Sequence, residues 1–234
     1  MRKKHGLNMI MGAVLGVGMG GLDALDTSDW KKGLIVGVSY QTGLINIQTE
    51  NRIKRDGMNV NANGLGFLIG YTGYFRDDQM FGARYYAFLD WQMFGAQYNP
   101  SPYGGGGYYG GNNLLTYGAA ADFFYNFFQG SVYRNDISLD LGTYVGVGIA
   151  GSSWLLGDTG QDKLGIPSLG LPSVNVSAFQ FLFNIGLRAL LVDQHGIDLG
   201  FKIPTINDRY YTSDRYSVKL RRNFAFYIGY NYHF

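Results

Sequence analysis

The chain contains no cysteine among its 234 residues. This absence excludes disulfide bonds, a thiol nucleophile and a thiolate metal site. Proline is scarce, with 5 residues. No run of about 18 apolar residues exists, and the mean hydropathy is −0.07, so a transmembrane helix bundle is excluded. The length suits one domain with a sizeable core.

Glycine and aromatic residues are abundant instead. There are 36 Gly, 19 Tyr and 16 Phe residues, whereas Leu- and Ala-rich helical patterns are missing. This composition favours close-packed β-strands bordered by aromatic side chains.

The first 24 residues are typical of a secretory signal peptide. A basic start (Arg2, Lys3, Lys4) precedes an apolar, Gly-rich stretch over 9–22, and Ala24 is a plausible cleavage position. We expect a signal peptide over 1–24 and one domain over 25–234. A short membrane anchor or a buried helix is the alternative. Cleavage would remove three of 19 basic and one of 17 acidic residues and leave a formally neutral chain, which gives nucleic-acid binding no electrostatic basis.

The last eleven residues alternate strictly between an aromatic or Ile residue and a small or polar one, ending on Phe234. Such a period of two marks a strand with one apolar face, and a terminal strand of this kind is typical of outer-membrane barrels. Eight segments show comparable alternation: 33–45, 63–75, 80–92, 114–127, 137–150, 177–190, 197–203 and 218–234. Their connections are expected to be long after the first, third, fifth and seventh segments and shorter after the others, as with extracellular loops and periplasmic turns.

The predicted fold is therefore all-β: a transmembrane antiparallel up-and-down β-barrel of about eight strands. A soluble barrel or sandwich is the alternative. Its inward apolar face would be rich in Val, Leu and Ile, whereas here aromatic residues lie near the strand ends and Gly, Asn, Arg and Asp occupy the opposite face.

Seven charged residues share the glycine-bearing phase of their segments and are expected to point into the lumen. They are Arg84, Asp90, Asp122, Asp140, Arg188, Asp198 and Lys202. Eight strands leave an interior just wide enough for side chains, so these charges are expected to pair as a structural plug. A selective or gated narrow pore built from the same charges is the alternative.

Two loops carry candidate interaction residues. The stretch 98–113 interleaves Gly with Tyr103, Tyr108 and Tyr109, and the last loop combines aromatic with basic side chains: Arg209, Tyr210, Tyr211 and Arg215. Tyr supplies amphipathic contact area. A host or surface partner, or anionic lipopolysaccharide, fits these sets, and a mobile loop without a ligand is the alternative.

No catalytic or cofactor site is expected. The histidines are His5 in the signal segment and His195 and His233, both predicted on the periplasmic side, so no triad can gather at the outer rim. No metal-ligand spacing is present. The glycine pattern over 146–151 matches a dinucleotide fingerprint only by chance, because a strand end and a polar loop surround it.

Several strings resemble the Helicobacter outer membrane protein family, which includes porin-like members and host adhesins. They are GARYYAFLD (82–90), NLLTYG (113–118), DFFYNF (122–127), FLFNIGLR (181–188), HGIDLGFKIPTIN (195–207) and LRRNFAFYIGYNYHF (220–234). The resemblance implies an outer-membrane barrel exposed at the cell surface. The large adhesins insert a long domain, often with cysteine pairs, ahead of most barrel strands. Here only residues 46–62 separate the first two segments, so the chain is similar to a short, barrel-only member.

Two functional expectations follow. The first is a surface-exposed structural or adhesin-like interaction protein that acts through its loops; the alternative is a small porin. By resemblance to other barrels, Tyr230, Tyr232 and Phe234 are expected to form the signal that the barrel-assembly machinery reads.

Overall fold

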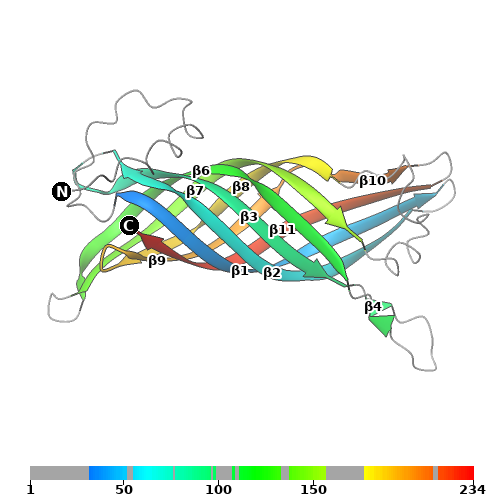
Figure 1. Ribbon diagram of the computed structural model, residues 1–234, viewed down its shortest axis with the longest axis horizontal. Coiled ribbons are helices and arrows are strands. Elements are labelled where there is room, and N and C mark those ends of the chain that lie inside the picture. Colours follow the sequence, from blue (N-terminus) through cyan, green and yellow to red (C-terminus); the bar gives the residue numbers. More distant parts are fainter. Residues whose placement is uncertain are drawn as a thin grey trace, which may run out of the picture.

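The computed structural model describes residues 32–51, 55–75, 77–95, 97–98, 107–108, 111–132, 137–156, 177–212 and 216–234. The predicted signal peptide lies outside these residues. Eight strands form one closed antiparallel barrel in which each strand pairs with the next and β11 returns to β1 (Figure 1). Their bounds are β1 (Gly33–Asn51), β2 (Arg55–Tyr74), β3 (Phe81–Phe94), β6 (Asn112–Val132), β7 (Ile137–Leu155), β8 (Ser177–Leu191), β9 (His195–Pro204) and β11 (Tyr216–His233). The predicted fold class is confirmed.

Three short strands complete the described structure. β4 (Gln97–Tyr98) and β5 (Gly107–Tyr108) pair with each other. β10 (Asp208–Thr212) pairs with β11 beyond the end of β9. Along β11, β9 reaches Ala225 and β10 takes over at Leu220, so β10 continues the line of the short strand β9.

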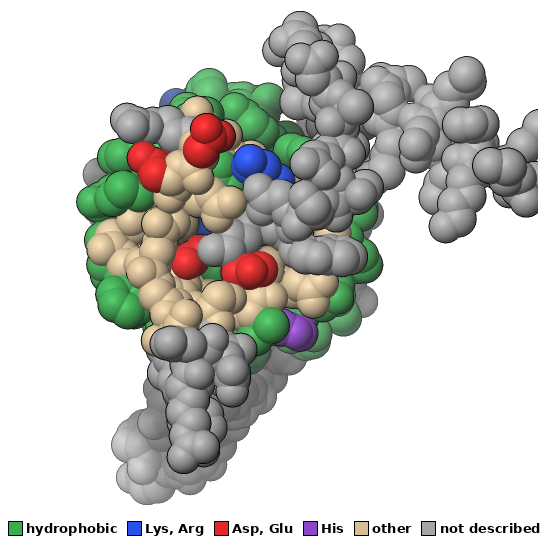
Figure 2. Space-filling view, turned by 90° about the vertical axis from the view of Figure 1, so that its left-hand side faces the viewer, with side chains coloured by type: hydrophobic (Ala, Val, Ile, Leu, Met, Phe, Trp, Pro, Cys, Tyr) green, Lys and Arg blue, Asp and Glu red, His purple; other side chains and the backbone are tan. Residues whose placement is uncertain are grey.

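The middle of the barrel carries its apolar side chains outward. Residues such as Phe67, Val145 and Ile185 are about half exposed on the outer surface, while polar neighbours on the same strands are buried inside. Figure 2 looks along the barrel and shows hydrophobic side chains at the perimeter, with charged ones nearer the centre. This apolar band is the lipid-facing surface of a membrane barrel. No helix among the described residues is long and apolar enough to cross a membrane.

The two ends of the barrel differ. The start of β1 and the end of β11 lie together, since Ile35 pairs with His233, and the connections over 75–80, 133–136 and 192–194 join strands at this same end. The end of β3, the start of β6, the end of β7, the start of β8, the end of β9 and the start of β11 lie at the opposite end. Short turns face the periplasm and longer loops the exterior, so the termini mark the periplasmic end.

The first connection is shorter than expected. β1 continues to Asn51 and β2 begins at Arg55, so only residues 52–54 join them. The long loop predicted over 46–62 is wrong. The strands continue because their alternation persists with the opposite polarity: Ile45 and Val60 point inward, whereas Asn46 and Asn59 point outward and hydrogen-bond to each other across the strands. The rim parts of β1 and β2 therefore lack the outward-facing apolar residues by which the sequence predicts strands.

The outer part of the barrel consequently has a core of its own. Twelve buried apolar and aromatic residues form it: Ile45, Ile47, Val60, Ala62, Phe94, Leu114, Trp154, Leu156, Tyr210, Tyr211, Val218 and Leu220. We call this set the outer core. An apolar inside with a polar outside is the arrangement that suits water rather than lipid. The barrel therefore extends beyond the bilayer as a water-exposed rim with the outer core inside it.

The outer core should dominate the stability of the rim. Leu220, which is fully buried, is expected to lose about 2–4 kcal/mol of unfolding free energy on replacement by Ala, because a cavity remains. Ile228→Ala, on the lipid-facing surface of the same strand, should cost less because lipid tails fill the space. Urea unfolding in vesicles compares the two variants. Equal losses would contradict the outer core.

Candidate functional site

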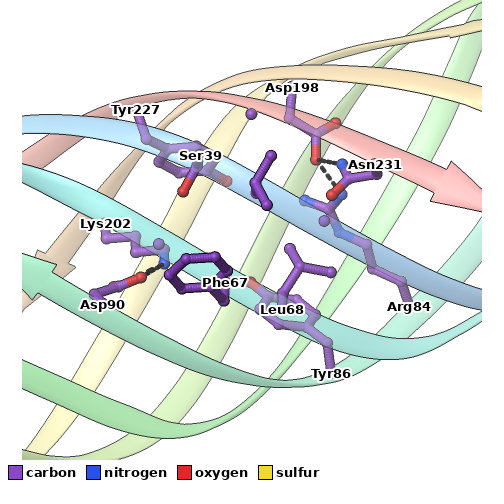
Figure 3. Close-up of a pocket in the computed structure, with 14 residues that line it drawn as sticks. Ser39, Phe67, Leu68, Arg84, Tyr86, Asp90, Asp198, Lys202, Tyr227 and Asn231 are labelled. Carbon is purple, nitrogen blue, oxygen red and sulfur yellow. Dashed lines mark hydrogen bonds and ion pairs between the residues drawn. The ribbon is translucent and has the colours of Figure 1, made fainter.

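The centre of the lumen contains a buried ion triad. Arg84 on β3 donates from Nε to Asp122 Oδ2 on β6 at 2.8 Å and from Nη1 to Asp198 Oδ2 on β9. Asn231 on β11 adds a hydrogen bond to the same Asp198 oxygen at 2.8 Å. All four side chains are buried, and Figure 3 shows Asn231 and Arg84 converging on Asp198. The Arg84 guanidinium thus links three strands: β3, β6 and β9.

A second ion pair lies beside the triad. Lys202 on β9 places its Nζ 2.8 Å from both carboxylate oxygens of Asp90 on β3. Gln41 on β1 donates a third hydrogen bond, from Nε2 to Asp90 Oδ1, at 2.5 Å. The carboxylate is therefore held by donors from two walls of the barrel, as Figure 3 shows for Lys202.

Aromatic rings enclose these cations. The Arg84 guanidinium lies 4.5 Å from the ring centroid of Tyr144, and Lys202 Nζ lies 4.7 Å from that of Phe88. The hydroxyls of Tyr144 and Tyr227 hydrogen-bond to each other. Such cation–π contacts stabilise a positive charge that is buried away from water.

Glycines make room for the large lumen side chains. A Cβ atom at Gly200 would lie 2.0 Å from the Tyr144 hydroxyl, and one at Gly146 would lie 1.9 Å from Asp122 Oδ1. Both positions therefore require glycine while those side chains stay in place. The glycine-rich faces of the strands therefore leave the space that the charged cluster occupies.

The cluster nearly fills the centre of the barrel. The cavity among Arg84, Tyr86, Asp90, Asp198 and Lys202 has a volume of about 10 Å³. A single water molecule needs a cavity of about 10–15 Å³. Side chains therefore fill this part of the lumen.

All seven predicted lumen charges point inward and are buried. The structure brings five of them into ion pairs: Arg84, Asp90, Asp122, Asp198 and Lys202. Asp140 is also buried, and Arg188 places its guanidinium 3.9 Å from the ring centroid of Phe124. The structure thus pairs those five residues inside the barrel, whereas the use of the cluster as a plug or a pore stays a prediction.

Sequence reasoning missed one lumen cation, Arg222. Its side chain is buried, and its Nη1 lies 3.1 Å from Gln92 Oε1. The regular alternation of the last strand places Arg222 on the same face as Phe224, which is the lipid face. A β-bulge in the pairing between Leu44 and Ile45 leaves Asn223 without a partner and shifts the register of β11. One extra residue moves a side chain to the other face of the sheet, so Arg222 enters the lumen.

The candidate interaction set of the last loop is partly wrong. Tyr210 and Tyr211 are 1% and 9% exposed and belong to the outer core. Both face inward because the pairing of β10 with β11 is irregular between Arg209 and Tyr211, which leaves Tyr210 without a cross-strand partner on β11. Arg209 alone of that set points outward among the described residues. Tyr103, Tyr109 and Arg215 lie outside the described residues, as does the side chain of Tyr108, so an interaction role for them stays a prediction.

A buried carboxylate fastens β10 to the barrel. Asp208 accepts hydrogen bonds from Trp154 Nε1 at 2.6 Å and from Gln180 Nε2 at 2.5 Å. These partners come from β7 and β8, so Asp208 bridges the gap left where β9 ends. Burial raises the pKa of Asp208 to about 6, although the two hydrogen bonds and the charge of Arg222 act in the opposite direction.

The C-terminal strand is tied to the barrel at the periplasmic end. Tyr230 and Phe234 point outward, and the ring centroids of Tyr232 and Phe234 lie 4.8 Å apart. His195 Nδ1 lies 2.7 Å from the Tyr230 hydroxyl, and Phe234 N donates to Leu34 O at 2.9 Å. Their recognition by the assembly machinery stays a prediction. Within the part of the chain that the structure describes, no group of three or more His, Asp or Glu side chains could hold a metal ion.

Comparisons with known proteins add a family and several similar folds. A family model described as Helicobacter outer membrane protein matches residues 66–234. No curated protein matches the chain at a significant level.

Three solved structures illustrate the similarity. OprG from Pseudomonas aeruginosa is 11% identical with a TM-score of 0.44, covering 86% of this chain and 96% of that one. Ail of Yersinia pestis is 13% identical with a TM-score of 0.29, covering 85% and 98%. Neisserial surface protein A is 12% identical with a TM-score of 0.28, covering 84% and 97%.

The ion triad should behave as a unit. Replacing Arg84 by Met should lower the unfolding free energy by about 3–5 kcal/mol, because Asp122 and Asp198 would remain buried without their cation. Adding Asp122→Asn and Asp198→Asn should recover much of that loss. Urea unfolding in vesicles measures both effects. A triple variant that is less stable than Arg84→Met would show that the carboxylates do not depend on Arg84.

The rim should be sensitive to pH through Asp208. A carboxyl whose folded pKa lies above its ordinary value of 3.8 favours folding when protonated, so its contribution decreases as pH rises from about 4 through about 6. The thermal midpoint of the wild type, relative to Asp208→Asn, should fall across this interval. All other carboxyls are common to both proteins. A midpoint difference that stays constant from pH 4 to pH 7 would contradict the assignment.

Proposed function

Because the chain belongs to the Helicobacter outer membrane protein family, we propose that it is a closed, surface-exposed barrel with a structural or interaction role. The protein is located in the bacterial outer membrane. The proposal concerns what the barrel does there. It rests above all on one observation, the filling of the lumen at two successive levels.

The first level is the charged cluster in the bilayer. Arg84 and Lys202 reach across the lumen to carboxylates on other strands, and aromatic rings fill the space between them. An ion that passed this level would have to displace buried pairs whose separation is costly. Ion pairing therefore supports a plug more than a selectivity filter.

The second level is the outer core. It lies between the charged cluster and the exterior, and its members are apolar or aromatic, with Trp154 and Leu220 almost completely buried. A hydrophobic constriction opposes the passage of hydrated ions. Two different barriers in series support a barrel that does not conduct, in contrast to a small porin.

The extended rim supports the interaction role. Its core holds the ends of β1, β2, β7 and β11 as one packed unit outside the bilayer, with polar residues such as Asn46 and Asn59 facing water. Loops on a rigid scaffold are the usual place for recognition. The Gly/Tyr-rich stretch 98–113 and the connections over 157–176 and 205–215 all start from this rim.

A catalytic role is not part of the proposal. His195 begins β9 directly after a periplasmic turn, and His233 pairs with Ile35 beside the chain terminus. Both lie at the end of the barrel away from the rim, as the sequence predicts. The rim therefore receives no general base from them.

Conductance in a planar bilayer tests the proposal. The refolded wild-type protein should remain silent, after a heat-dependent gel shift has confirmed that the barrel is folded. Arg84→Ala should lower the thermal midpoint and leave the silence unchanged, because the outer core still closes the lumen.

A permissive variant provides the matched positive control. This variant truncates large side chains of the outer core and of the charged cluster in one chain. It carries Trp154→Ala, Leu220→Ala, Arg84→Ala and Lys202→Ala. If it folds, it should show channel openings. Discrete, reproducible openings of the wild type, with an ion selectivity that Arg84→Ala changes, would establish the porin alternative.

A further inference from the structure

Three basic side chains lie together on the outside of the rim. Arg209 on β10 stands directly opposite Lys219 on β11, and Arg221 follows two residues later on the same face of β11. Two like charges at directly opposed positions repel each other and destabilise a sheet. We call Arg209, Lys219 and Arg221 the basic cluster.

The surroundings of the cluster supply little compensating charge. Lys219 Nζ lies 3.2 Å from Glu50 Oε2 in a half-exposed pair. The other cross-strand neighbours on β1 are the neutral amides Gln48, opposite Lys219, and Asn46, opposite Arg221. Among the described residues, therefore, one carboxylate faces three cations.

The cluster lies immediately outside the lipid-facing band. On β11 the next outward residues toward the periplasm are Phe224 and Phe226, and the bulged Asn223 separates them from Arg221. Phe201 on β9 packs against both rings, with centroid distances of 6.1 and 5.2 Å. An aromatic surface at membrane depth thus continues into a cationic surface about 10 Å further along the strand.

This order of surfaces matches an amphiphile with a phosphorylated head. Acyl chains fit against the three Phe rings, and a phosphate group fits among donors that Arg presents in a planar fork. Because the cluster is at the outer end of the barrel, the lipid must come from the outer leaflet. We propose that Arg209, Lys219 and Arg221 bind the phosphate groups of an outer-leaflet lipid, which thereby anchors the rim at the membrane surface.

The proposal is independent of whether the barrel conducts. It concerns the outer wall, whereas closure concerns the lumen, so a conducting protein could still bind the lipid and a silent one could fail to. It also assigns a role to Arg209 that Tyr210 and Tyr211, turned into the outer core, cannot share.

Binding of diphosphoryl lipid A to the full-length protein in detergent tests it, with native mass spectrometry as the readout. The wild type should retain the lipid. A variant carrying Arg209→Gln, Lys219→Gln and Arg221→Gln should bind about a hundredfold more weakly, since each basic residue near an anionic surface contributes about fivefold. Lipid A lacking its phosphates should bind the wild type as weakly as the diphosphoryl form binds this variant.

Two controls separate phosphate recognition from loss of structure. Lys32→Gln removes one positive charge at the opposite end of the barrel and should leave binding unchanged. Arg209→Lys with Arg221→Lys keeps the charges and should retain most of the binding. In lipid-free detergent the triple variant should unfold at no lower temperature than the wild type, because its repulsion is relieved; if it fails to fold, the single variants Arg209→Gln and Arg221→Gln replace it.

The remaining outcomes overturn the proposal. Equal binding of the phosphate-free lipid would show that acyl contacts alone hold it. Displacement of lipid A by equimolar inorganic phosphate would indicate a site for free anions. Unchanged binding by the folded triple variant would place the lipid elsewhere.

Discussion

The width of an eight-stranded barrel constrains the whole structure. Its interior admits side chains but little else, so each inward residue must pack against, or pair with, a residue from the opposite wall. The chain meets this constraint by alternating glycines with large polar residues: Asp122 lies over Gly146, and Tyr144 over Gly186 and Gly200. Arg84 can then reach carboxylates on β6 and β9 at once, and the pairing holds strands together that are far apart in sequence.

The surroundings of the barrel change along its length, from lipid in the bilayer to water at the rim. In the bilayer the apolar side chains face outward and the charges face inward, whereas in the rim this order is reversed. Asp208 lies at the junction and joins β7, β8 and β10 through its hydrogen bonds to Trp154 and Gln180. The basic cluster lies at the corresponding level of the outer wall. The junction is thus where the buried Asp208, with its raised pKa, lies close to the outer core and to the basic cluster on the outer wall.

Much of this arrangement could be predicted from the sequence, and the exceptions have physical reasons. Regular alternation located eight strands and the seven inward charges, because the outward and inward faces of a membrane strand differ in composition. The rim escaped the prediction because its polarity is reversed, so Ile47 and Val60 were assigned to a loop over 46–62. Arg222 escaped because a bulge at Asn223 shifts the strand by one residue, which no periodic pattern reveals. Tyr210 and Tyr211 were expected at the surface because adjacent strand residues normally face opposite sides, and the irregular pairing between Arg209 and Tyr211 that turns both inward has no sequence pattern.

The absence of cysteine allows a direct measurement of the central claim that the lumen is closed from both ends. Ser39→Cys places a thiol beside the central cavity. Asn61→Cys places one on the outward face of β2, between the outer-core residues Val60 and Ala62, and Ser131→Cys places one next to the periplasmic end of β6. A membrane-impermeant thiol reagent added to either side of oriented vesicles should label the end positions from their own side and leave Cys at position 39 unmodified from both. Rapid labelling at position 39 from either side would show an open path through the corresponding barrier and contradict the closed barrel.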